Sequence, residues 1–157
     1  DLLEGLVLVS SGPGIADEAE RAARAEADLA TAARVTELGV EAFLAEWVAQ
    51  PIFATLPPDR AQVAERAATH DVASLQHQLV ALGQGSQPPR WEDLGSLDVP
   101  VMLLSGEADP KYDAIAEAMF DAIPDGLRFT LPGGHALPLE QPEAVAAALR
   151  TFLDDLA

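Results

Sequence analysis

The sequence predicts an α/β protein in which helices cover a parallel sheet and an all-helical segment interrupts the order of strands. Apolar runs at 5–11 and 99–105 are expected to be buried strands, and 127–131 is expected to be a third strand. The regions 111–123 and 143–156 follow helical spacing, and the last of them places Val145, Leu149 and Phe152 on one face. Near-continuous apolar strands that alternate with helices are typical of a parallel sheet.

The region between the first two strands is expected to be entirely helical. Acidic residues at 17–20 suit the positive end of a helix dipole, and Pro58 suits a first helical turn. The predicted helices lie at about 16–35, 41–49, 58–69 and 72–82, and a short segment at 91–97 leads into the second strand. We therefore divide the chain into a core strand and connection at 1–15, a helical cap at 16–90 and a C-terminal α/β core at 91–157.

Composition excludes several classes of protein. The 157 residues carry 9 Lys and Arg against 26 Asp and Glu, a formal net charge of −17, and no Cys. Disulfide scaffolds and thiolate zinc sites are excluded, and no apolar run is long enough to cross a membrane. The acidic balance argues against nucleic acid as a partner, and a cytoplasmic location is expected by default.

Two loops carry the residues best suited to chemistry. Asp109 follows the strand at 99–105, where a carboxylate can orient an imidazole; capping of the next helix is the alternative. His135 follows two glycines just beyond the strand at 127–131. His70 and His77 lie in helical segments without a partner at metal-ligand spacing, so no metal site is expected.

The order Asp then His is the latter part of the Ser, Asp, His order of α/β-hydrolases. No Gly-x-Ser-x-Gly motif occurs, and Ser11 is a poor candidate because no strained turn from strand to helix follows it. We therefore expect the C-terminal part of an α/β-hydrolase fold. The nucleophilic serine should lie in an N-terminal half of the same enzyme, which would be a partner of this chain.

Several stretches resemble a family of the menaquinone pathway, the 2-succinyl-6-hydroxy-2,4-cyclohexadiene-1-carboxylate synthases, or MenH enzymes. The loops at 106–112 and 134–142 resemble the family but are largely generic to α/β-hydrolases. More discriminating are Phe-Leu-Ala-Glu-Trp-Val-Ala-Gln-Pro-Ile-Phe at 43–53, the region 83–91 and Lys111. Segments 9–15 and 20–28 also follow the family pattern, so the resemblance spans nearly the whole chain.

The resemblance implies a lyase that needs no cofactor. Such enzymes eliminate pyruvate from 2-succinyl-5-enolpyruvyl-6-hydroxy-3-cyclohexene-1-carboxylate. It implies His135 and Asp109 as catalytic residues that activate the serine. It also implies that Arg24, Trp47 and Lys111 bind the polyanionic small-molecule substrate.

Alternatives remain open for these residues and for the activity. Arg24 could instead pair with Asp28 or Glu20, with Arg21 in its place at the site, and Trp47 could simply pack the cap. Glu140 is expected to be a structural residue that anchors the final helix. A generic ester or thioester hydrolase shares the Asp and His loops, and a non-catalytic binding domain could retain the same fold.

Overall fold

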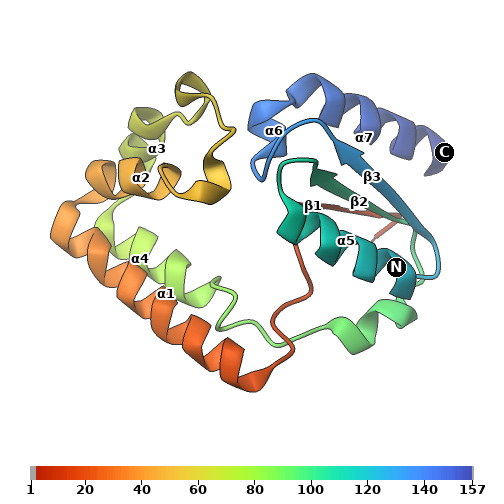
Figure 1. Ribbon diagram of the computed structural model, residues 1–157, viewed down its shortest axis with the longest axis horizontal. Coiled ribbons are helices and arrows are strands. Elements are labelled where there is room, and N and C mark those ends of the chain that lie inside the picture. Colours follow the sequence, from red (N-terminus) through yellow and green to blue (C-terminus); the bar gives the residue numbers. More distant parts are fainter. Residues whose placement is uncertain (1–2, 157) are drawn as a thin grey trace. The chain divides into compact units, whose positions relative to one another are not determined.

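The computed structural model describes residues 3–156, which form two compact units (Figure 1). The first unit combines the described residues up to Gly12, the segment Pro51–Arg60 and the described residues from Glu92 onward. The second unit combines Pro13–Gln50 with Ala61–Trp91. The division at residues 15 and 90 made from the sequence stays a prediction.

The first unit is built on a parallel sheet, as the sequence predicts. Its strands are β1 (Leu6–Val9), β2 (Val101–Gly106) and β3 (Gly126–Leu131), in the order β1-β2-β3. Val101 is in register with Leu6 on one side and with Gly126 on the other. β2 is buried at every position, whereas β1, expected to be buried, is half-buried because among the described residues it has a neighbouring strand on one side only.

Helices pack on both faces of the central strand because successive side chains of a strand point in opposite directions. Met102 and Leu104 form a core with Leu137, Val145 and Phe152. Those three residues belong to α6 (Leu137–Glu140) and α7 (Pro142–Leu156). The other face of β2 contacts α5 (Pro110–Ala122), so both faces are shielded (Figure 1).

The second unit is helical. Its helices are α1 (Glu18–Leu38), α2 (Val40–Val48), α3 (Val63–Thr69) and α4 (Val72–Ala81). Asp17 caps α1, and Gly39, with a φ of 76°, separates α1 from α2. The core consists of Val35, Phe43, Leu44 and Leu75.

One predicted helix is wrong in its extent. The region expected to be helical at 58–69 is instead a short 3₁₀ turn, η2 (Pro58–Arg60), followed by α3. Gln62 adopts the left-handed conformation with a φ of 51°, and this breaks the helical path. Two further 3₁₀ turns, η1 (Pro51–Phe53) and η3 (Trp91–Ser96), complete the described elements. The short helix α6 was not predicted from the sequence.

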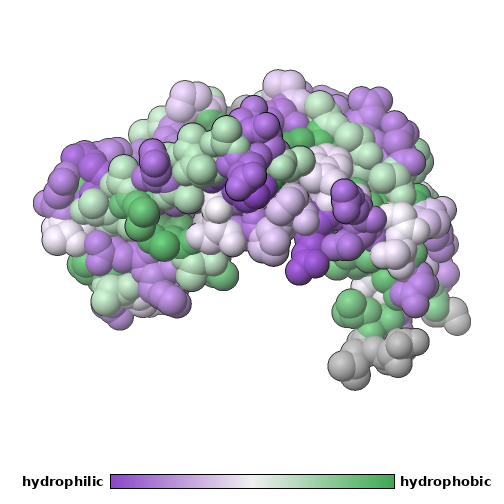
Figure 2. Space-filling model, turned by 90° about the horizontal axis from the view of Figure 1, so that it is seen from below, coloured by the Kyte–Doolittle hydropathy of each residue, from purple (hydrophilic) through white to green (hydrophobic). Residues whose placement is uncertain are grey.

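The surface mixes side chains of both kinds. Figure 2 shows hydrophobic and hydrophilic residues interspersed on the face in view. Single large apolar side chains such as Leu82 and Leu153 are 69% and 60% exposed, which is ordinary for a folded domain. In the part of the chain that the structure describes, none of the helices combines the length and the apolar composition of a membrane-spanning helix.

Candidate active site

Asp109 lies where β2 gives way to α5. Its backbone N–H donates to the Gly106 carbonyl at 2.9 Å, which closes a tight turn at the end of the strand. The side chain is 5% exposed and is the N-cap of α5, with Oδ1 accepting a long hydrogen bond of 3.4 Å from the Tyr112 N–H. Asp109 therefore caps α5, the alternative that the sequence offered, but the cap uses only one of its two carboxylate oxygens.

The other oxygen of Asp109 faces His135. Nδ1 of His135 lies 2.7 Å from Oδ2 of Asp109, although 26 residues separate the two along the chain. They meet because β2 and β3 are adjacent parallel strands, so the loops that follow them leave the same edge of the sheet. A carboxylate at Nδ1 favours the tautomer with its proton on that nitrogen and leaves Nε2 as an acceptor.

Backbone hydrogen bonds join the two loops. Glu107 donates to the Leu131 carbonyl and Ala108 donates to the Gly133 carbonyl, both at 2.9 Å. This approach requires a glycine at position 106, where a Cβ would collide with the carbonyl oxygens of Gly133 and Gly134. The separation between Asp109 and His135 is thus set by main-chain contacts as well as by their own side chains.

Aromatic rings flank the imidazole of His135. The Tyr112 ring centroid lies 4.6 Å away and that of Phe53 lies 5.9 Å away, the latter in an edge arrangement. The His135 side chain is 21% exposed, and no residue in the described part of the chain hydrogen-bonds to its Nε2. This nitrogen is therefore available to exchange a proton with a further group.

Lys111 stands beside this pair at the start of α5. It is exposed, and its Nζ lies 5.4 Å from the centroid of the buried Tyr112 ring. Such a position suits a weak cation–π contact and leaves the ammonium accessible to an anion. Within residues 3–156, no cluster of His, Asp and Glu could hold a metal ion.

A second polar cluster, centred on Asp113, lies next to the loop that carries Asp109. Oδ1 of Asp113 accepts hydrogen bonds from Ser105 at 2.6 Å and from Arg128 and Thr130 at 2.8 Å. The Ser105 hydroxyl above all, with Thr130 and Arg128, holds the pKa of Asp113 below its ordinary value. Since Ser105 is fully buried, this cluster ties β2, β3 and α5 together behind Asp109.

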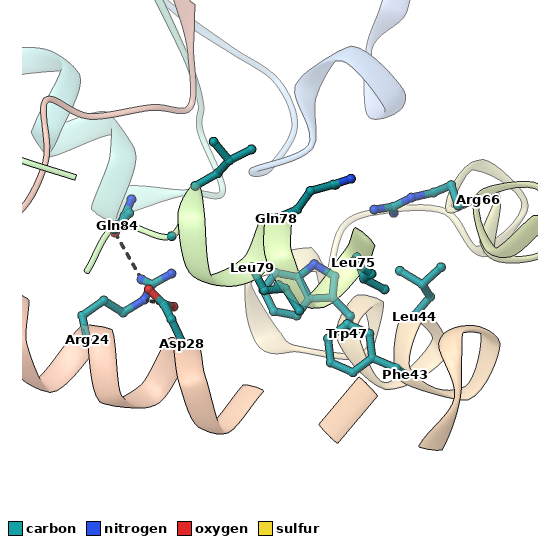
Figure 3. A pocket seen from close by; sticks show the side chains of 12 residues that line it. Arg24, Asp28, Phe43, Leu44, Trp47, Arg66, Leu75, Gln78, Leu79 and Gln84 are labelled. Carbon is teal, nitrogen blue, oxygen red and sulfur yellow. Dashed lines mark hydrogen bonds and ion pairs between the residues drawn. The ribbon is translucent and has the colours of Figure 1, made fainter. Parts of the chain in front are cut away.

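The second unit contains a cavity of about 320 Å³ (Figure 3). Two of the predicted binding residues, Arg24 and Trp47, line it, together with apolar side chains such as Leu75 and Leu79. The sequence did not single out Arg66, a second cation of this cavity. The sequence signal that could have pointed to Arg66 is that it is one of only 9 Lys and Arg residues and lies in a predicted, Ala-rich helix of the cap.

Arg24 makes the ion pair that the sequence offered as an alternative. Its Nε lies 2.7 Å from Oδ1 of the buried Asp28, and Nη1 lies 3.2 Å from the Gln84 amide oxygen. The backbone N–H of Gly85 also donates to Asp28, at 3.2 Å. Arg24 is thus oriented by its neighbours on the cavity wall, while Arg21 donates to the carbonyls of Ile15 and Ala16.

Ser10 and Ser11 directly follow β1. Ser10 adopts the left-handed conformation with a φ of 43°, a backbone conformation that residues other than glycine rarely adopt. The next helix begins only at Glu18, which leaves no direct turn from strand to helix. The hydroxyls of Ser10 and Ser11 are buried without a partner among the described residues.

The fold and the Asp–His pair define the class of protein. The chain belongs to the alpha/beta hydrolase family, whose model matches residues 2–148. Within this class it is similar to the 2-succinyl-6-hydroxy-2,4-cyclohexadiene-1-carboxylate synthase of Serratia proteamaculans, with 34% identity over 96% of this chain and 58% of that protein. The resemblance seen in the sequence is therefore confirmed.

The chain is also similar to solved structures. MenH from S. aureus superposes with a TM-score of 0.92 at 28% identity, covering 98% of this chain and 60% of that one. An esterase from Thermogutta terrifontis gives 0.78 at 25% identity, covering 98% and 57%. The chain thus spans less than two thirds of the length of these relatives.

Proposed function

We propose that this chain supplies the Asp and His of a MenH-type lyase in menaquinone biosynthesis. The enzyme would convert 2-succinyl-5-enolpyruvyl-6-hydroxy-3-cyclohexene-1-carboxylate into 2-succinyl-6-hydroxy-2,4-cyclohexadiene-1-carboxylate and pyruvate. The observation that carries the proposal is the 2.7 Å contact between His135 and Asp109, with Nε2 left unbonded by the described residues. The similarity to synthases of this name supports the choice of reaction.

The chemistry needs a base at a ring carbon. A serine from outside this chain would take the ring proton after Nε2 of His135 accepts the serine's own proton. A carbon–carbon double bond then forms as the carbon–oxygen bond to the enolpyruvyl group breaks, and the enolpyruvate released becomes pyruvate. The Asp109 carboxylate stabilises the imidazolium while the proton resides on His135.

The substrate carries several carboxylates, whereas the chain has a net charge of −17. Local cations must therefore offset the general repulsion. We assign this role to Lys111 and Arg24, with Trp47 as an apolar contact. Lys111 is accessible, and Arg24 is held in place by Asp28 and Gln84 on a cavity wall that also contains Arg66.

The experiment is a pyruvate-release assay on the native protein isolated with any companion polypeptide, and on this chain alone. The native protein should release pyruvate, and His135→Ala should reduce kcat by about 100- to 10,000-fold. This chain alone should give no turnover, because its 157 residues contain no Gly-x-Ser-x-Gly motif. Unchanged turnover in His135→Ala would contradict the proposed role and favour a binding function.

Charge variants separate the lyase from a generic esterase. Lys111→Ala should lower kcat/KM for pyruvate release by about tenfold or more, because a charge-assisted contact is lost. The matched control is Arg150→Ala, which removes an exposed cation on α7. Hydrolysis of a neutral p-nitrophenyl ester without pyruvate release, insensitive to Lys111→Ala, would refute the lyase and support an ester hydrolase.

A further inference from the structure

The carboxylate of Glu140 accepts hydrogen bonds from the backbone on both sides of His135. Oε2 accepts the Gly134 N–H at 2.7 Å, and Oε1 accepts the Ala136 N–H at 3.1 Å. These are charge-assisted bonds to the two residues that flank the imidazole-bearing residue. The sequence assigned Glu140 to anchoring the final helix, but its carboxylate is bonded to the His loop.

The loop that carries His135, residues 131–140 and here called the His loop, needs these hydrogen bonds because of its composition. It contains two consecutive glycines, and Gly133 has a φ of 136°, a conformation that favours glycine. Glycines allow the loop to pass close to the end of β2, but they also leave the backbone many alternative conformations. A side chain that fixes both neighbouring peptide groups restricts the direction in which the Cα–Cβ bond of His135 points.

The segment 51–60 contacts the neighbours of Glu140 and of His135. Arg60 Nη1 donates to the Leu139 carbonyl at 3.0 Å, which ties α6 to the segment at 51–60. Gly134 is buried, and a Cβ there would collide with Oγ1 of Thr55. These contacts restrain the residues next to Glu140 and His135, and all of them lie within the first unit.

We propose that Glu140 is a positioning residue that sets the His135 imidazole against Asp109. Both of its oxygens are engaged by backbone N–H groups, so it acts through the loop and not as an acid or base. Small displacements matter here, because a hydrogen bond of 2.7 Å between Nδ1 and Oδ2 weakens steeply with misalignment. The inference rests on the proposed function only in treating His135 as the residue that moves the proton.

The test is proton NMR of this chain, without substrate. An imidazole N–H bonded to a carboxylate gives a far-downfield resonance, which Asp109→Asn assigns by removing it. In Glu140→Gln, one N–H would face an amide NH₂ in place of an oxygen acceptor. We expect the resonance to be lost or shifted upfield, and the amide protons of Gly134 and Ala136 to exchange about tenfold faster or more.

The control is Glu143→Gln, which removes the same charge from an exposed position at the start of α7. It should leave the resonance and both exchange rates unchanged. An unaltered resonance in Glu140→Gln, with the amide spectrum still dispersed, would overturn the proposal. Glu140→Ala provides a second variant to which the same two outcomes apply. Because no turnover is measured, failure here is distinct from failure of the proposed lyase activity.

Discussion

Replacing Gly106 by alanine tests how the two loops are brought together. A Cβ at this position would lie inside the contact distance of the Gly133 and Gly134 carbonyl oxygens. These are backbone atoms of the loop that follows β3, so they cannot rotate away as the end of a side chain would. The His loop must shift, and the hydrogen bond of 2.9 Å from Ala108 to the Gly133 carbonyl is strained or lost.

The magnitude follows from these contacts. Inserting a methyl group into a tightly packed site costs about 1–3 kcal/mol. Loss of a backbone hydrogen bond adds about 1 kcal/mol. We therefore expect the free energy of unfolding to fall by about 3 kcal/mol in Gly106→Ala. The far-downfield imidazole resonance of His135 should also be lost, since the loop that carries the ring has moved.

The assay is urea unfolding followed by far-UV circular dichroism, with Gly95→Ala as the matched control. A Cβ at Gly95 meets nothing nearer than the Ala122 carbonyl oxygen at 3.8 Å, an ordinary contact. That variant should stay within about 1 kcal/mol of the parent protein. Equal stability of the two alanine variants, with the resonance retained in Gly106→Ala, would refute the close approach described for these loops.

Two further predictions concern the first unit. The lowered pKa of Asp113 means that its hydrogen bonds stabilise the fold above the ordinary aspartate pKa of about 3.9. This stabilisation is lost as the pH falls through the lowered native pKa. Below about pH 5, the urea midpoint of Asp113→Asn should therefore depend less on pH than that of the parent protein. The exposed control Asp154→Asn should keep the parental dependence on pH. The same pH dependence in both variants would contradict this linkage between the Asp113 pKa and stability. Leu137→Ala, at a fully buried core position, should cost about 3 kcal/mol by the same titration. Leu153→Ala, 60% exposed, should cost less than about 0.5 kcal/mol, and a similar loss in both variants would contradict the assigned core.

Periodicity and turn chemistry in the sequence predicted much of this protein. Apolar runs located β1 and β2, because a strand covered by helices needs few polar residues. The sequence also placed a strand at 127–131, where the structure has β3. Gly106 and the glycines before His135 indicated tight turns at the ends of strands. Asp109 and His135 stood out because each follows such a strand, and their order along the chain pointed to the α/β-hydrolase class.

Other features depend on contacts between residues that are far apart in the sequence, and these features only the tertiary structure decided. Asp109 and His135 approach to 2.7 Å only because β2 and β3 are neighbours in register. The roles of Glu140 and Arg66 depend on which groups face them, and local sequence does not encode this. The break of the predicted helix at Gln62 likewise reflects a backbone conformation that no residue pattern near it required. Local patterns determine elements, whereas side-chain partnerships arise from the packing of those elements, and the candidate site consists of such partnerships.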